Sequence, residues 1–252
     1  MKRRRILFFL LVLFILLMVS PVFSQTKNQN VNPGFTINVK SGDNWSLPVK
    51  IMVLLTFLSL LPTLFIILTS FTRIAITFYF LKQALGAREM PPNQVLVGLA
   101  LFLTIFIMTP TFNAIYNQAI VPYEKGKINE VQAIEKASIP LKHFMLRQTR
   151  EKDLKYIIEL SKSKYPKRRE DVSMTTLIPA FILSEIKTGF EIGFLIYIPF
   201  LIIDVVVASI LVSLGMIFLP PVMVSLPFKI ILFILADGWT LLVGALIKSF
   251  GG

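Results

Sequence analysis

The sequence has 252 residues, of which 55% are hydrophobic, with 22 Phe, no Cys and a mean hydropathy of +0.73. Apolar residues in this excess, gathered in long runs, indicate an integral membrane protein. The net charge of +12 gives little reason to expect nucleic-acid binding, because the basic residues are scattered between hydrophobic runs, and the lack of Cys excludes disulfides and thiolate metal sites.

Residues 1–24 are typical of a signal peptide. The basic residues Lys2 to Arg5 precede an uninterrupted apolar run, Ile6 to Val19, and a Val-Phe-Ser site allows cleavage before Gln25. The alternative is an uncleaved anchor helix. Residues 25–47 are polar and lack helical periodicity, so we expect them to form a flexible extracytoplasmic lead.

A first pair of hydrophobic helices is predicted over residues 48–123. The first helix contains Pro62, where we expect a kink, and the second covers Gln94 to Ile115. Pro91 and Pro92 mark the loop between the two helices.

Residues 124–175 are the only block in which charged residues are dense. We expect Ser138 to cap a helix whose first turn contains Pro140. Apolar residues, Phe144 and Met145 among them, recur at helical spacing and give this unit one apolar face. The prediction is a small, soluble, helical extracytoplasmic domain that cannot bury a large core alone.

Residues 176–252 are predicted to form a second hydrophobic helical pair with a pore loop. The run from Thr188 to Phe218 would be about 46 Å long as a helix, whereas a bilayer core needs only about 20 residues. Pro220 and Pro221 end any helix, and a last one is expected over Phe228 to Phe250. The fold class is therefore an all-α membrane-type protein with four long, kinked hydrophobic helical segments. The over-long third segment indicates packing against other protein or the lining of a path.

Several ionisable side chains interrupt these apolar segments. A carboxylate such as Asp204 costs about 2.5 to 3.5 kcal/mol at a bilayer centre. It is therefore either a proton or ion relay or one member of a helix-pairing interaction. Lys187 and Glu191 are four residues apart on one helical face and are predicted to neutralise each other. The expected buried or intersubunit polar residues are Arg73, Glu185, Lys187, Glu191, Asp204 and Asp237.

The residues before the Pro-Pro pair are large and apolar. Met216, Ile217 and Phe218 on a loop are suited to closing a pore by a hydrophobic seal. The alternative is ordinary packing in lipid or in a protein core.

No catalytic, cofactor-binding or metal-binding constellation is present in the sequence. His143 is the only histidine, and there is no HExxH, GxSxG or Walker sequence. We therefore expect a protein that is not an enzyme and that carries no cofactor.

Seven stretches between about residues 45 and 250 resemble one protein family in wording and order. They are Ser70–Ile74, Pro91–Val95 with Gly98–Thr104, Phe144–Glu151, Pro179–Thr188, Ile198–Asp204, Leu219–Lys229 and Asp237–Trp239. The family that they resemble is FliP, called SctR in injectisomes, of the type III secretion export gate.

This resemblance implies a ring subunit of a bacterial flagellar export gate. Members of the family assemble as a homo-oligomer of five with FliR and FliQ, associated with FlhA and FlhB. Unfolded flagellar substrates pass through this assembly, in the inner membrane and the basal body. A methionine-rich loop seals the closed pore in the family. It maps to Met216, Ile217 and Phe218, of which only the first is Met.

The resemblance also implies that Phe144 and Met145 form a lateral contact between subunits. Two other functions are open on the residues alone. One is a small proton-coupled secondary transporter that uses Asp204, although no internal repeat is evident. The other is an intramembrane enzyme, for which catalytic residues are lacking.

Overall fold

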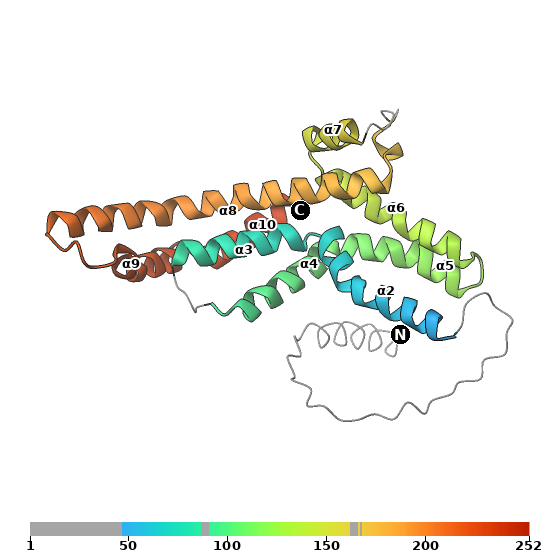
Figure 1. The fold of residues 1–252 in the computed structure, drawn as a ribbon, viewed down its shortest axis with the longest axis horizontal. Coiled ribbons are helices and arrows are strands. Elements are labelled where there is room, and N and C mark those ends of the chain that lie inside the picture. Colours follow the sequence, from blue (N-terminus) through green and yellow to red (C-terminus); the bar gives the residue numbers. More distant parts are fainter. Residues whose placement is uncertain (1–46, 87–90, 162–165, 167, 252) are drawn as a thin grey trace, which may run out of the picture. The chain divides into compact units, whose positions relative to one another are not determined.

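The computed structural model describes residues 47–86, 91–161, 166 and 168–251, and all regular elements in these ranges are helical (Figure 1). The predicted signal peptide, and the predicted lead up to residue 46, lie outside the described residues. The chain divides into two units, Met1–Leu64 and Phe65–Gly252. Most of α2 (Leu47–Leu68) belongs to the first unit, and all other described helices belong to the second.

The first hydrophobic segment is broken later than expected. α2 continues through Pro62 to Leu68, and α3 (Phe71–Leu85) begins after two polar residues. The side chain of Thr69 donates to the carbonyl of Phe65 and accepts from the backbone N–H of Phe71. These local bonds compete with the helical ladder and allow the chain to turn.

The second hydrophobic helix is α4 (Asn93–Ile115), within one residue of the predicted start. It continues through the π-helical turn η1 (Tyr116–Ile120) into α5 (Val121–Glu124), which makes 32 helical residues in all. Pro122, which follows η1, cannot donate to the carbonyl four residues back, and this favours a local change of bonding pattern.

The first long helix of the charged block is α6 (Glu130–Gln148), which is capped by Asn129 and not by Ser138 as predicted. The side chain of Asn129 accepts from the backbone of Gln132, and the Gln132 side chain accepts from the backbone of Asn129. This capping box satisfies two free backbone donors and fixes the start of the helix. Pro140 therefore lies in the interior of α6. The block continues with α7 (Glu151–Leu160) and the short η2 (Arg169–Asp171).

α8 (Met174–Ser213) is the longest helix, with 40 residues. At 1.5 Å per residue it is about 60 Å long, well beyond a membrane span. The chain leaves it through Gly215, whose φ of 74° is the left-handed conformation that glycine adopts without strain. α9 (Pro221–Leu235) starts earlier than predicted because proline fits a first helical turn, and α10 (Gly238–Ser249) follows after a bend of 64°.

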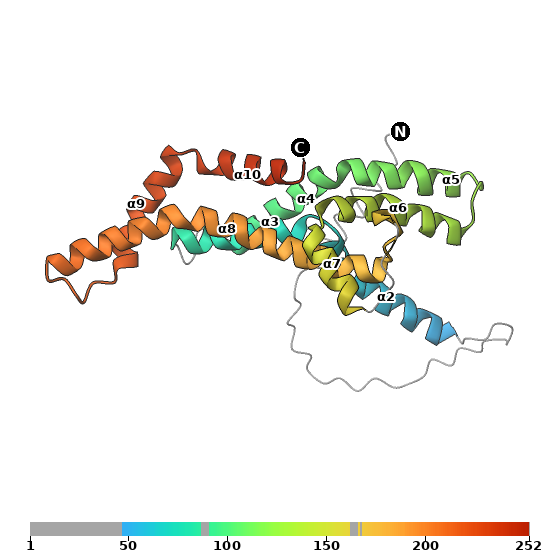
Figure 2. The same cartoon turned by 90° about the horizontal axis from the view of Figure 1, so that it is seen from above.

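Within residues 65–252, α3 lies along α8, and α9 folds back beside the far end of α8 (Figures 1 and 2). The α3–α8 contact is close because it contains glycine: a Cβ on Gly193 would lie 2.6 Å from the Phe80 ring. α6 packs against α4 and α8, and α7 packs against α8. The charged block thus shares its core with the hydrophobic helices of this unit.

In the part of the chain that the structure describes, two helices are long and apolar enough to cross a membrane by length and composition, Asn93–Glu124 and Met174–Ser213. The number rises to four if each bent pair, Leu58–Leu68 with Phe71–Leu85 and Pro221–Leu235 with Gly238–Ser249, counts as one span. The helical fold and the hydrophobic segments agree with the sequence prediction for the described residues.

Candidate functional site

Arg73 on α3 and Glu185 on α8 form a buried ion pair in which the two residues are 2% and 0% exposed. The guanidinium meets the carboxylate through two atoms: Nε donates to Oε2 at 3.1 Å, and Nη2 donates to Oε1. Such a two-pronged arrangement is the strong form of an ion pair. A buried pair is costly to break because the remaining charge would be uncompensated.

Three further residues complete the surroundings of Arg73. Its Nη1 donates to the backbone carbonyl and the hydroxyl of Ser249 at 2.8 and 3.0 Å, and Nη2 donates to Gln148 Oε1 at 3.0 Å. Its guanidinium carbon lies 3.7 Å from the centre of the Phe250 ring. The group therefore joins α3, α6, α8 and the end of α10.

A second polar cluster fixes α7 on α8. Asp153 is buried and accepts from the Ser184 hydroxyl at 2.9 Å and from the Lys187 ammonium. Burial raises the pKa of Asp153, but the hydrogen bonds from Lys187 and Ser184 outweigh it and hold the pKa below its ordinary value. Asp153 is therefore ionised at neutral pH.

Arg150 extends this second cluster toward the surface. Its side chain contacts the Glu191 carboxylate and donates to Thr188 Oγ1 at 2.9 Å, and the hydrogen bond to Glu191 raises the pKa of the guanidinium. The prediction that Lys187 and Glu191 neutralise each other is wrong: Lys187 pairs with Asp153 instead, and Glu191 pairs with Arg150. In the chain, the Lys187 side chain is about half exposed and the Glu191 side chain is largely exposed.

A third cluster joins α8 to α9. Asp204 accepts from the Lys229 ammonium at 2.6 Å and from the Ser225 hydroxyl, and Lys229 is 2% exposed. The remaining expected polar residue, Asp237, is exposed at the break between α9 and α10, where its φ is 47°. Aspartate tolerates this left-handed conformation better than most residues, so Asp237 allows the chain to turn between α9 and α10.

The loop between α8 and α9 carries Met216, Ile217 and Phe218. All three side chains are exposed, and Phe218 is 99% exposed. Met223, in the first turns of α9, is also exposed. The hairpin therefore presents unpartnered apolar side chains at its tip, away from the three polar clusters.

The structure contradicts the expected role of Phe144 and Met145 as contacts with another subunit. They are 3% and 0% exposed and lie in the core of their own chain, where the Phe144 ring packs against Phe181 and Phe250. Helical spacing correctly placed them on one apolar face, but that face is covered by α8 and the end of α10.

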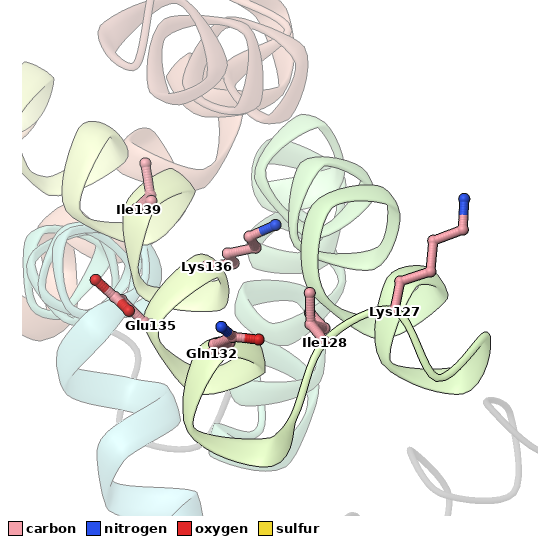
Figure 3. Close-up of a pocket in the computed structure, with 6 residues that line it drawn as sticks. All are labelled: Lys127, Ile128, Gln132, Glu135, Lys136 and Ile139. Carbon is pink, nitrogen blue, oxygen red and sulfur yellow. The ribbon is translucent and has the colours of Figure 1, made fainter.

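A shallow pocket of about 360 Å³ lies beside the start of α6 (Figure 3). It is lined by Lys127, Ile128, Gln132, Glu135, Lys136 and Ile139. The close-up shows Lys127 directed away from the other lining side chains, and no polar group converges on a shared point. Among the described residues, no group of three His, Cys, Asp or Glu could hold a metal ion.

Sequence reasoning missed Asp153, Gln148, Ser249, Phe250 and Lys229 as members of the clusters. One signal was available for the last: between Val205 and Ala236, Lys229 is the only charged residue. It is the natural partner for Asp204 across the Pro-Pro turn. The contacts of Arg73 with Gln148 and Ser249 span 75 and 176 residues, and no local pattern indicates them.

The sequence comparisons identify the family of the chain. Residues 54–246 match the FliP family. The "Flagellar biosynthetic protein FliP" of Bacillus subtilis (strain 168) is 52% identical over 208 residues, which cover 82% of this chain and 94% of that relative. Proteins of the same name from Pectobacterium carotovorum and Borreliella burgdorferi are 51% and 44% identical, over 83% and 90% of this chain and 81% and 93% of their own lengths. The chain belongs to the FliP family.

Proposed function

We propose that this chain is a core subunit of the flagellar type III protein export gate and forms the pore through which unfolded flagellar proteins leave the cell. The observation that carries the proposal is the 52% identity over 208 residues to a protein named for flagellar biosynthesis. The family match over residues 54–246 includes Arg73 and Glu185, the Asp153 and Asp204 clusters and the α8–α9 loop, and it ends before Ser249 and Phe250. The chain is not an enzyme in this proposal.

The exposed apolar surface supports assembly into a larger complex. Within an 18-residue apolar stretch of α8, only 11% of the residues are buried in the chain. Large side chains stand exposed along it, among them Phe190, Phe194, Leu195, Ile202 and Val205. Contiguous apolar surface of this kind marks a contact with lipid or with other protein.

The proposed assembly is a homo-oligomeric ring of five subunits in the bacterial inner membrane and the flagellar basal body. FliR and FliQ complete the ring, and FlhA and FlhB associate with it. Residues 124–175 lie on the extracytoplasmic side in this proposal.

Met216, Ile217 and Phe218 form the pore seal in this proposal. A loop that closes a pore reversibly needs bulky apolar side chains with no fixed partner, because a hydrophobic constriction excludes water and ions without hydrogen bonds. The exposure of all three side chains at a hairpin tip supports this role. Ile217 and Phe218 replace methionines of the family pattern but keep the apolar character.

The test of the seal uses two triple variants expressed with the other gate subunits. Replacing Met216, Ile217 and Phe218 together with Gly should make resting cells leak ions and small solutes. The matched control replaces the same residues with Leu and should keep the resting permeability. Equal permeability of the Gly variant and the unaltered protein would remove the seal from the proposal.

The transporter alternative depends on Asp204 as a proton carrier. In the chain, Asp204 is held by Lys229 and Ser225, which supports a role in pairing α8 with α9. Asp204→Asn should therefore impair assembly of the complex more than it alters the pH dependence of export. A normally assembled complex with lost proton coupling would favour the transporter.

A further inference from the structure

We propose that the Arg73 side chain is a clasp that fastens the end of α10 to α8, and so holds both ends of the segment that carries the α8–α9 loop. The clasp consists of Arg73, Gln148, Glu185, Ser249 and Phe250. The clasp itself follows from the hydrogen bonds and ring contacts among these five residues. Only its use in holding the seal loop rests on the proposed function.

Every donor of the Arg73 guanidinium has an acceptor. A guanidinium has five N–H donors and accepts nothing. All five of Arg73 are used, two by Glu185, two by Ser249 and one by Gln148. With the end of α10 in place, Arg73 is 2% exposed, and its Nη1 group depends on Ser249 for both of its acceptors. A buried donor without a partner is disfavoured, so the closed arrangement is the one in which this guanidinium is satisfied.

Contacts other than those of the Arg73 guanidinium also hold the end of α10. Gln148 Nε2 donates to the backbone carbonyl of Phe250 at 3.2 Å. The Phe250 ring lies against Arg73 on one side and stacks on Phe144, with ring centres 6.4 Å apart. The Ser249 hydroxyl donates to the carbonyl of Leu246 at 2.7 Å, which leaves its lone pairs for Arg73. Each contact requires the same position of the end of α10.

The two contacts of Arg73 lie at the two ends of one long chain segment. Residues 186–248 run from the Arg73–Glu185 contact out along α8, through the loop and α9, and back along α10 to the Arg73–Ser249 contact (Figure 2). The two arms of this segment are also joined at Asp204 and Lys229. With the clasp closed the segment is anchored at both of its ends. With the clasp open, the end of α10 loses its contacts to Arg73 and Gln148, while α8 stays packed on α3 at Gly189 and Gly193.

The chemistry of the clasp requires arginine. A lysine ammonium carries its three donors on a single nitrogen atom. It therefore cannot match the planar guanidinium, whose three nitrogen atoms face acceptors in different directions. Arg73→Lys keeps the charge opposite Glu185 but cannot satisfy Gln148, Ser249 and Glu185 together. Phe250→Ala opens the same clasp from the other side and leaves the Arg73–Glu185 contact unchanged.

The test measures cysteine modification by maleimide in the full chain, purified in detergent. The sequence has no Cys, so each introduced thiol reports on one position. Leu246→Cys reports on α10 and Thr77→Cys on the α3–α8 contact, both at positions that are 0% exposed. Lys248→Cys is the control for reactivity, because Lys248 is exposed with the clasp closed or open.

With Arg73→Lys or Phe250→Ala, the modification rate at Leu246→Cys should rise at least about tenfold, while the rates at Thr77→Cys and Lys248→Cys change less than about twofold. An unchanged rate at Leu246→Cys in both variants would overturn the clasp. A parallel rise at Thr77→Cys in both variants would also overturn it, because the clasp residues would then hold the whole core. Neither readout requires export, so failure of the proposed function would leave this result standing.

Discussion

The Arg73 clasp and the tip of the α8–α9 hairpin use the same helix in opposite ways. Near the start of α8, Glu185 is fully buried and meets a guanidinium with every donor satisfied. Beyond its far end, Phe218 is 99% exposed and Met216 and Ile217 are exposed with it. A buried charge holds its partners in one geometry because any other leaves it uncompensated. Apolar side chains on a loop impose no such geometry, so they suit a contact that must open and close.

The largest expected effect is on stability at the buried end. Arg73→Met leaves Glu185 buried without its counter-charge, so the free energy of unfolding should fall by about 3–5 kcal/mol. The measurement is chemical denaturation in detergent, followed by circular dichroism. The double variant Arg73→Met with Glu185→Leu should recover a large part of the loss. If the double variant is no more stable than Arg73→Met alone, the two charges do not depend on each other.

The close packing of α3 on α8 gives the next largest effect. Gly193→Ala places a methyl group 2.6 Å from the Phe80 ring, and the resulting strain should lower the unfolding free energy by about 1–3 kcal/mol. Gly244→Ala is the matched control, because no atom lies within 4 Å of a Cβ there. That control should be neutral or slightly stabilising, since alanine is the better helix former. Equal behaviour of both variants would mean that α3 and α8 can move apart at little cost.

The Asp153 cluster is intermediate between the two regions, because its carboxylate is buried while Lys187 is half exposed. The folded-state pKa of Asp153 lies below its ordinary value near 4. Its contribution to stability is therefore present above about pH 4 and is lost as the pH falls through the folded pKa. Water screens the exposed partner, so Asp153→Asn should cost about 1 kcal/mol at pH 7. Unfolding of both proteins followed from pH 7 to pH 3 should converge at the acid end, and a constant difference would contradict the assignment.

The smallest effect on stability is expected at the hairpin tip. Phe218→Ser removes no buried contact and should change the unfolding free energy by less than about 0.5 kcal/mol. The same variant should raise the resting permeability of cells that carry the gate. A clear loss of stability would show that Phe218 packs within its own chain, and the contrast between the two ends of α8 would then disappear.

The sequence by itself determined the class of the fold and the presence of a break between α8 and α9. Long apolar runs specify helices because their backbone groups must be satisfied without water. Pro220 and Pro221 prevent one continuous helix because they lack a backbone donor, although α8 itself already ends at Ser213 and Pro221 begins α9. The same local chemistry placed Met216, Ile217 and Phe218 together before the Pro-Pro turn. The start of α6 was missed since Ser138 resembles a cap as closely as Asn129 does.

Only the tertiary structure decided which side chains meet. Lys187 and Glu191 have the spacing of a helical ion pair, but α7 brings Asp153 and Arg150 to them, and these contacts win because they also satisfy Ser184 and Thr188. Phe144 and Met145 lie on an apolar face in the sequence, and the packing of α8 and Phe250 converts that face into core. The partners of Arg73 come from three other helices. Such contacts depend on the path of the whole chain, which local periodicity does not contain.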